Sequence, residues 1–163
     1  MTQIPDLFLE KSRSLLLSDY WPKIERSLDG LSPDDIWWRP NEASNSIGNL
    51  MLHLCGNVTQ WIMGGVGRQE ITRDRQREFD ERDPLPAVEL KRRMRTVLEE
   101  ADRVMSALKP EDLLSRRAIQ GYDVTSLEAI YHVVEHFGMH TGQIILLAKA
   151  RLGRDLSLWE APD

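Results

Sequence analysis

Residues 125–152 read TSLEAIYHVVEHFGMHTGQIILLAKARL and predict one long helix. The helix opens with a capping box, in which the side chains of Thr125 and Glu128 satisfy otherwise free backbone amides, and it ends at Gly153. At the rise of an α-helix, this segment would span about 42 Å. A helix of that length in a chain of 163 residues must be a principal member of a helix bundle.

Three further segments also carry helical patterns, over about residues 4–28, 45–67 (capped by Asn45 or Ser46) and 86–109. In the third, apolar residues alternate at steps of four and three, the pattern of a bundle seam: Leu90, Met94, Val97, Ala101, Val104 and Leu108. No alternating apolar pattern and no Asn-Gly or Asp-Gly turn indicates a strand. The sequence therefore predicts an all-α four-helix bundle in a single domain, residues 1–163.

The connection between the second and third helices, about residues 66–85, is long and charged. A link of this length can cross the whole bundle, so these two helices need not be antiparallel neighbours. We expect a solvated loop here rather than a binding loop, and its charged residues include Arg68, Arg73, Asp74, Arg75, Arg77 and Glu78.

Net charge, cysteine count and the length of the hydrophobic runs exclude several classes of protein. The 21 basic and 26 acidic side chains leave a net charge of −5, which argues against a general affinity for nucleic acid or an anionic membrane. The one cysteine excludes a disulfide framework and a cysteine-only metal site. The longest aliphatic run, 144–148, is far too short to cross a bilayer, and residues 1–10 lack the basic start of a signal peptide. We therefore expect a cytoplasmic protein.

All four histidines fall on two of the predicted helices: His53 on the second, and His132, His136 and His140 on the fourth. The fourth-helix histidines repeat at helical spacing within a stripe that is apolar at both ends, so their rings are expected to face the core. Because burying several imidazoles without partners is costly, each ring needs one. A polar core patch of imidazoles, water and backbone is one interpretation. We favour a shared metal ion, since the histidines lie on two facing helices.

Helical geometry limits which histidines can share an ion. Side chains at i and i+4 converge on one face about 6 Å apart along the axis, whereas His132 and His140 would lie about 12 Å apart. The fourth helix therefore supplies either His132 and His136 or His136 and His140, and His53 completes three nitrogen ligands. No histidine lies on the other two helices, which leaves a coordination position for water or substrate, as in catalytic sites.

Other motifs at these residues fit less well. The spacing of His136 and His140 is that of zincin peptidases, but Phe137 stands where their general-base glutamate would be. Residues 132–136 match the inverted H-x-x-E-H pattern, but that class needs a further acidic ligand far downstream and only 27 residues follow. Cys55 lies about 200° around the helix from His53, so we expect a core residue rather than a nucleophile.

Two stretches carry a family resemblance: residues 45–61, NSIGNLMLHLCGNVTQW, and residues 136–144, HFGMHTGQI. They place one histidine on the second helix and a His-x-x-x-His pair, followed by x-Gly-Gln, on the fourth. In this pattern the chain resembles the DinB-like superfamily of metal-binding four-helix bundles. Residues 37–40 (WWRP), 73–75 (RDR) and the pair at 78–79 (EF) are similar to one branch of that group.

The resemblance implies His53, His136 and His140 as metal ligands and leaves His132 outside. It also implies an up-down-down-up bundle with a long crossover between the second and third helices, and often a homodimer. The metal would be divalent, with zinc or nickel as first candidates and iron, cobalt or manganese as others. Characterised relatives use such an ion to activate a low-molecular-weight thiol for transfer or isomerisation.

Our leading hypothesis is therefore a metal-dependent transferase. The ion would ionise a thiol that arrives with a small-molecule substrate, or a water molecule in hydrolytic relatives. Gln143 and Asn57, each one turn from a ligand, are candidates for orienting a ligand or substrate, with buried structural amides as the alternative. Trp61 and Tyr20 are expected to pack in the core. The rival hypotheses are a non-catalytic metal-binding or stress-response bundle that acts through its dimer surface, and a bundle without metal.

Overall fold

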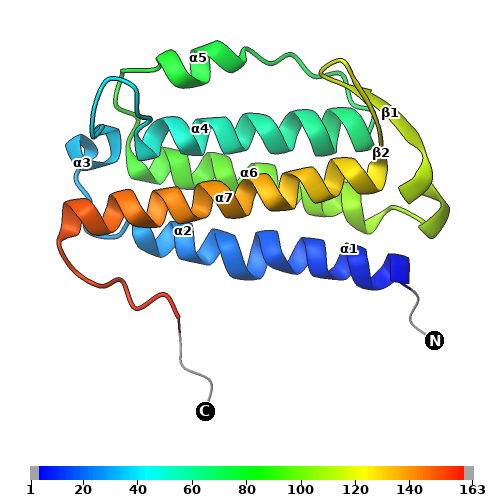
Figure 1. Ribbon diagram of the computed structural model, residues 1–163, viewed down its shortest axis with the longest axis horizontal. Coiled ribbons are helices and arrows are strands. Elements are labelled where there is room, and N and C mark those ends of the chain that lie inside the picture. The colour runs from blue at the N-terminus through cyan, green and yellow to red at the C-terminus, as the bar shows by residue number, and fades with distance from the viewer. Residues whose placement is uncertain (1–3, 160–163) are drawn as a thin grey trace.

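The computed structural model describes residues 4–159. Residues 1–3 and 160–163 of the predicted domain lie outside the described residues, and residues 1–3 also belong to the segment in which we expect no signal peptide. Four helical rods lie side by side (Figure 1). They comprise α1 (Ile4–Ser14) continued by the π-helical η1 (Leu15–Tyr20) and α2 (Trp21–Ser27); α4 (Ile47–Val58) continued by the π-helical η2 (Thr59–Val66); α6 (Ala87–Ser106); and α7 (Ser126–Leu152). The predicted all-α four-helix bundle is confirmed.

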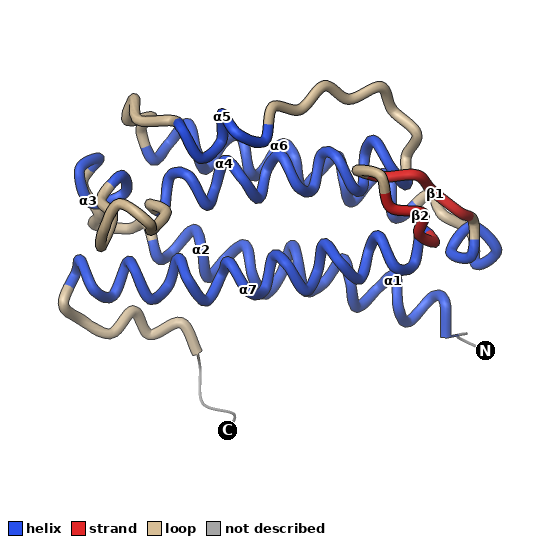
Figure 2. Tube along the Cα trace, turned by 45° about the horizontal axis from the view of Figure 1, so that its top comes forward, coloured by secondary structure: helices blue, strands red, loops and turns tan. Residues whose placement is uncertain are grey.

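The order of the rods is up-down-down-up. The first rod and α7 run in one direction, and α4 and α6 run in the other (Figure 1). After η2 the chain returns along the whole bundle through residues 67–86, a crossover that carries the short helix α5 (Arg75–Asp80) over α4 (Figure 2). Helix α4 thereby packs beside both α6 and α7. This is the long connection that the sequence indicated.

Helix ends follow the local chemistry of their residues. Ser46 caps α4, with its Oγ accepting from the Asn49 amide, and Thr125 caps α7 in a reciprocal box with Glu128. Gly153 closes α7 with a φ of 62°, in the left-handed region where a side chain is disfavoured. The predicted caps of the second and fourth helices are therefore present, and Ser46 rather than Asn45 serves the second.

The expectation of no strand was wrong. A small antiparallel hairpin pairs β1 (Arg116–Ile119) with β2 (Tyr122–Thr125) just before α7. Its two turn residues, Gln120 and Gly121, have φ values of 52° and 83°. Such turns usually contain Asn-Gly or Asp-Gly, so a glutamine in the first position concealed the signal. Three other short elements were also not expected: α3 (Pro33–Trp37), the helix α5 of the crossover, and the 3-10 turn η3 (Pro110–Leu114).

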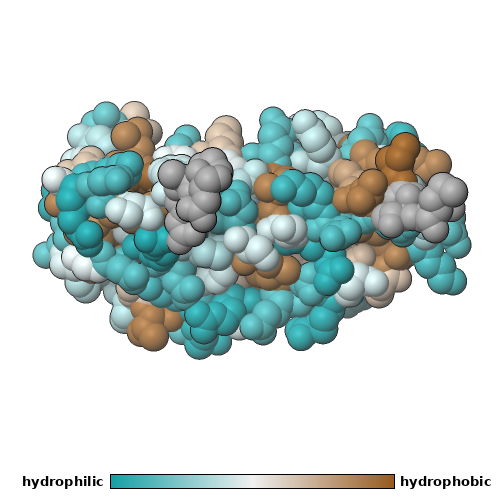
Figure 3. Space-filling model, turned by 90° about the horizontal axis from the view of Figure 1, so that it is seen from below, coloured by the Kyte–Doolittle hydropathy of each residue, from teal (hydrophilic) through white to brown (hydrophobic). Residues whose placement is uncertain are grey.

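The core lies along the bundle axis. Phe137, Leu16, Ile24 and Met51 are among the large side chains that are fully buried there. Of the predicted seam of the third helix, Leu90, Met94 and Ala101 are buried, and Val97, Val104 and Leu108 are partly buried. Figure 3 shows one outer face, where hydrophilic residues surround smaller hydrophobic patches. Among the described residues, no helix combines the length and apolar character that crossing a membrane requires.

Removing the cap of α7 tests its contribution to stability. The Thr125 hydroxyl donates to the Glu128 carboxylate and accepts from the Glu128 amide. We expect Thr125→Ala to lower the free energy of unfolding by about 1 kcal/mol in chemical denaturation. Thr96→Ala is the control, because Thr96 is exposed within α6 and bonds only a carbonyl of its own helix. An equal loss in both variants would contradict the assigned role.

Candidate metal centre

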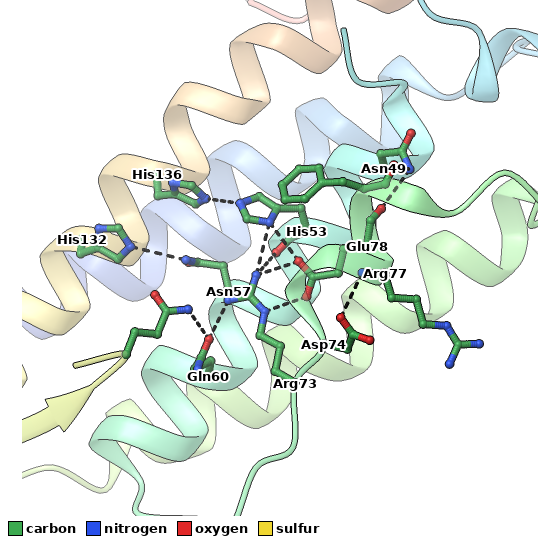
Figure 4. Close-up of polar contacts among 12 residues, drawn as sticks. Asn49, His53, Asn57, Gln60, Arg73, Asp74, Arg77, Glu78, His132 and His136 are labelled. Atoms are coloured by element: carbon green, nitrogen blue, oxygen red, sulfur yellow. Dashed lines mark hydrogen bonds and ion pairs between the residues drawn. The ribbon is translucent and has the colours of Figure 1, made fainter. Parts of the chain in front are cut away.

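Three histidines meet between α4 and α7. His53 comes from the middle of α4, and His136 and His140 lie one turn apart on α7. One ring nitrogen from each lies within 4.8 Å of the other two. The nearest pair is His53 Nε2 and His136 Nε2, which are 2.9 Å apart, and Figure 4 shows these two rings directed at one another.

The surroundings favour neutral imidazoles. His53 and His140 are buried, and His136 is half-buried. Burial, together with the neighbouring histidines and Arg73, lowers the pKa of His136 to about 3. Burial also lowers the pKa of His140, although a hydrogen bond to Gln143 opposes the shift. Neutral imidazole is the form whose nitrogen lone pair binds a metal.

His132 stands apart from this group. Its ring lies against Trp61, with 4.2 Å between centroids, and its Nε2 is 3.4 Å from Asn57 Nδ2. Helical spacing alone left two α7 pairs open, and the structure joins His53 to the pair at 136 and 140. Within residues 4–159, the trio is the only group of three or more histidine, cysteine or acidic side chains arranged to hold a metal ion.

The two amides singled out in the sequence differ in what they contact. Gln143 Oε1 is 2.7 Å from His140 Nδ1, and since an amide oxygen can only accept, the Nδ1 of His140 carries the proton. This leaves the Nε2 of His140 free to bind. Asn57 instead contacts His132, and its Oδ1 is buried without a hydrogen-bond partner.

The crossover supplies two charged residues that the sequence interpretation missed. Glu78 Oε2 lies 3.0 Å from His53 Nδ1. Arg73 donates to both oxygens of that carboxylate, at 2.7 and 2.8 Å, and to Gln60 Oε1 at 2.8 Å (Figure 4). Only 5% of the Arg73 side chain and 11% of the Glu78 side chain are exposed. The expectation of a solvated loop is therefore wrong for this part of the chain, where the paired charges bury each other against α4.

This charged pair is held in place by the residues around it. The amide of Asn49 donates to the backbone oxygens of Glu78 and Glu81, and Arg39 donates to the backbone oxygen of Phe79. The Phe79 ring lies 4.7 Å from the His53 ring. Burial would raise the pKa of Glu78, but the hydrogen bonds from Arg73 and His53 and the positive charge of Arg73 outweigh it and hold that pKa below its ordinary value. Glu78 is therefore ionised at neutral pH.

Open space adjoins the histidines on the α7 side. A hollow of about 90 Å³ is lined by His132, Glu135, His136 and Met139. A larger cavity of about 390 Å³ also includes His132, and its other lining residues are Trp61, Gln120, Tyr122, Val124 and Glu128. Trp61 is thus both buried and part of a cavity wall, whereas Tyr20 stacks on Phe137 in the core.

Cys55 does not face this space. Its Sγ lies 3.9 Å from Met94 Sδ, on the side of α4 that packs against α6, and burial raises the pKa of its thiol to about 12. It is partly buried and packs against the core, in agreement with the structural role expected from the sequence.

Comparison with known proteins agrees with this architecture. A family model described as "Protein of unknown function (DUF1572)" matches residues 3–160. The chain belongs to this family. The DUF1572 chain is also similar to a crystal structure of a DinB-like protein from Bacillus cereus ATCC 10987, with a TM-score of 0.67 and 16% sequence identity over 91% of this chain and 93% of the other. The structural similarity confirms the expected DinB-like fold, and at 16% identity it is evidence for the fold alone. No curated protein matches the chain.

The lowered pKa of His136 predicts how stability depends on pH. The folded protein keeps this imidazole neutral down to about pH 3, whereas the unfolded chain protonates it near 6.5. The unfolded state therefore binds more protons below pH 6.5, and the free energy of unfolding of the metal-free protein falls as the pH is lowered. We expect chemical denaturation at pH 7, 6 and 5 to show this decline, and His136→Gln to flatten it.

Met139→Gln is the control for that measurement, because it places the same side chain on the exposed part of α7 without removing a titrating group. It should keep the wild-type slope between pH 7 and 5. A His136→Gln variant with the full wild-type slope would show that His136 titrates at its ordinary value in the folded protein.

Proposed function

We propose that this chain binds one divalent metal ion through His53, His136 and His140, with zinc or nickel as the first candidates. The convergence of the three ring nitrogens is the observation that carries the proposal. Two nitrogens on one tetrahedral zinc ion lie roughly 3.3 Å apart, close to the 2.9 Å between the Nε2 atoms of His53 and His136. Three nitrogen ligands leave at least one coordination position for water or substrate.

We further propose that the site serves a thiol-dependent transferase or isomerase-type reaction on a small molecule. A divalent ion held by three neutral ligands lowers the pKa of a bound thiol or water. The thiol of the protein's one cysteine faces α6 rather than the site and is protonated, so the reactive thiol must arrive with the substrate. The small hollow reaches His136, and the larger cavity, which shares His132 with it, provides room for a small molecule near the proposed site.

The residues of the chain have separate roles in this proposal. Gln143 holds the His140 ring through Nδ1, which keeps the other nitrogen directed at the site. His132 and Trp61 line the approach rather than bind the ion. Asn57, whose Oδ1 lacks a partner, holds His132 from the α4 side. Homodimer formation and a cytoplasmic location remain predictions from the resemblance and the composition.

Elemental analysis tests the metal site. Protein purified without a histidine tag should contain close to one equivalent of a divalent metal ion, and His53→Ala, His136→Ala or His140→Ala should each abolish it. His132→Ala is the matched control, because His132 lies on the same face of α7 but outside the trio. Absence of metal from every preparation, including protein reconstituted with zinc and nickel, would contradict the proposed metal site.

An activity screen tests the reaction. The metal-loaded protein should accelerate the consumption of small electrophiles by low-molecular-weight thiols, and a chelator or His136→Ala should remove that acceleration. Metal-dependent turnover with water but without thiol would instead identify a hydrolase. Stoichiometric metal with no turnover across a broad thiol panel would favour a non-catalytic metal-binding bundle.

A further inference from the structure

We propose that Glu78 is a positioning residue, which orients the His53 ring so that its Nε2 can bind the metal ion. Arg73 holds Glu78 by hydrogen bonds, and Gly56 leaves the space that Glu78 occupies. The proposal rests on the proposed metal site. It concerns residues that approach His53 from the side of the ring opposite to His136, and Glu78 is not itself placed to be a ligand.

The hydrogen bond at His53 determines which nitrogen can bind. An ionised carboxylate only accepts, so the 3.0 Å contact requires that His53 Nδ1 carries a proton and donates it to Glu78. Arg73 Nη2 also lies 3.2 Å from that nitrogen, but both groups are donors, so Nη2 donates to the carboxylate and not to the ring. The Nε2 atom that faces His136 and His140 is then the ligand atom. A carboxylate at the remote nitrogen also makes an imidazole a better ligand.

Arg73 allows a carboxylate to remain ionised at this depth. Its two hydrogen bonds to Glu78 form a forked pair, and its third goes to Gln60 on η2. The pair has no net charge, which reduces the cost of burying Glu78 against α4. The crossover therefore places an oriented carboxylate at the Nδ1 side of the His53 ring.

Gly56 provides the space that the Glu78 and Arg73 side chains of the crossover occupy. It lies one turn after His53 on α4, and a Cβ atom placed there would come within 1.9 Å of Glu78 Oε1 and 2.7 Å of Arg73 Nε. Any side chain at this position must push the charged pair away from α4. A glycine inside a helix costs about 1 kcal/mol relative to alanine, so its presence here indicates that the close approach matters.

The test compares four variants in zinc-binding titrations against a chromophoric chelator. We expect Glu78→Gln and Gly56→Ala each to weaken zinc binding by about 10- to 100-fold. The double variant Glu78→Gln/Gly56→Ala should bind zinc about as tightly as the single variant with the lower affinity, because both changes break the same contact. Gly142→Ala is the matched control: it is also a helical glycine near the site, but its new Cβ would meet nothing within 4 Å, so wild-type affinity is expected.

A second readout is independent of metal. In the metal-free wild type, nitrogen-15 NMR of the histidine rings should show a protonated, slowly exchanging Nδ1 at His53, and Gly56→Ala should make that proton exchange rapidly. Circular dichroism and thermal unfolding of each metal-free variant establish that it is folded. Cobalt absorption spectra of the loaded proteins report whether the ligand geometry changes when the contact is lost.

The outcomes separate the two proposals. Tight zinc binding by the wild type, matched by Glu78→Gln and Gly56→Ala, overturns the positioning role and leaves the metal site intact. An Nδ1 without a proton in wild-type His53 overturns it as well. A wild type that shows the NMR signature but binds no metal overturns the proposed metal site, and with it the function assigned to Glu78. If Glu78→Gln does not fold, the Gly56→Ala and Gly142→Ala pair still decides the question.

Discussion

Three imidazole rings share one poorly solvated space between α4 and α7, and the groups packed around them must satisfy their ring nitrogens. A buried imidazole without a partner is destabilising, so each ring must find a donor, an acceptor or a cation. Within the cluster the nearest nitrogens face each other at 2.9 Å, and the outer nitrogens of His53 and His140 are bound to Glu78 and Gln143. The inner nitrogens are thereby left to converge on one point.

The up-down-down-up order places the crossover where it can act on this cluster. Because α4 and α6 run in the same direction, the chain must return along the length of the molecule, and it does so across the outer side of α4 (Figure 1). An antiparallel neighbour would have needed only a short turn. The long return carries Arg73, Glu78 and Phe79 to the back of His53, so a topological requirement becomes part of the candidate site.

The two sides of His53 differ in polarity. Toward α7 lie the half-buried His136 and the buried His140, with a small hollow beside His136 and a larger, aromatic-walled cavity beside His132. Toward the crossover, Arg73 and Glu78 neutralise each other within a hydrogen-bonded set of groups that is anchored by Asn49, Arg39 and Gln60. Hydrogen bonds to the outer ring nitrogens and space beside His136 are what a site needs to hold a metal ion while leaving a coordination position open.

Local sequence was sufficient for the features that depend on local physics. The caps at Ser46 and Thr125, the left-handed stop at Gly153 and the histidine stripe on α7 follow from side chains within a turn or two of one another. The resemblance then selected His53, His136 and His140, and the structure places their nitrogens together. The hairpin was not predicted from the sequence because Gln120 adopts a positive φ, which glutamine does in few turns.

Tertiary structure alone determined the rest. Nothing in the composition of residues 66–85 distinguishes a solvated charged loop from one whose Arg73 and Glu78 are buried, because the two charges become neutralised only when the crossover reaches α4. The role of Gly56 likewise depends on an atom 22 positions away in the chain, Glu78 Oε1, that occupies the space a side chain would fill. Helical periodicity reports which face a residue lies on, whereas contacts between distant segments depend on how the whole bundle is connected.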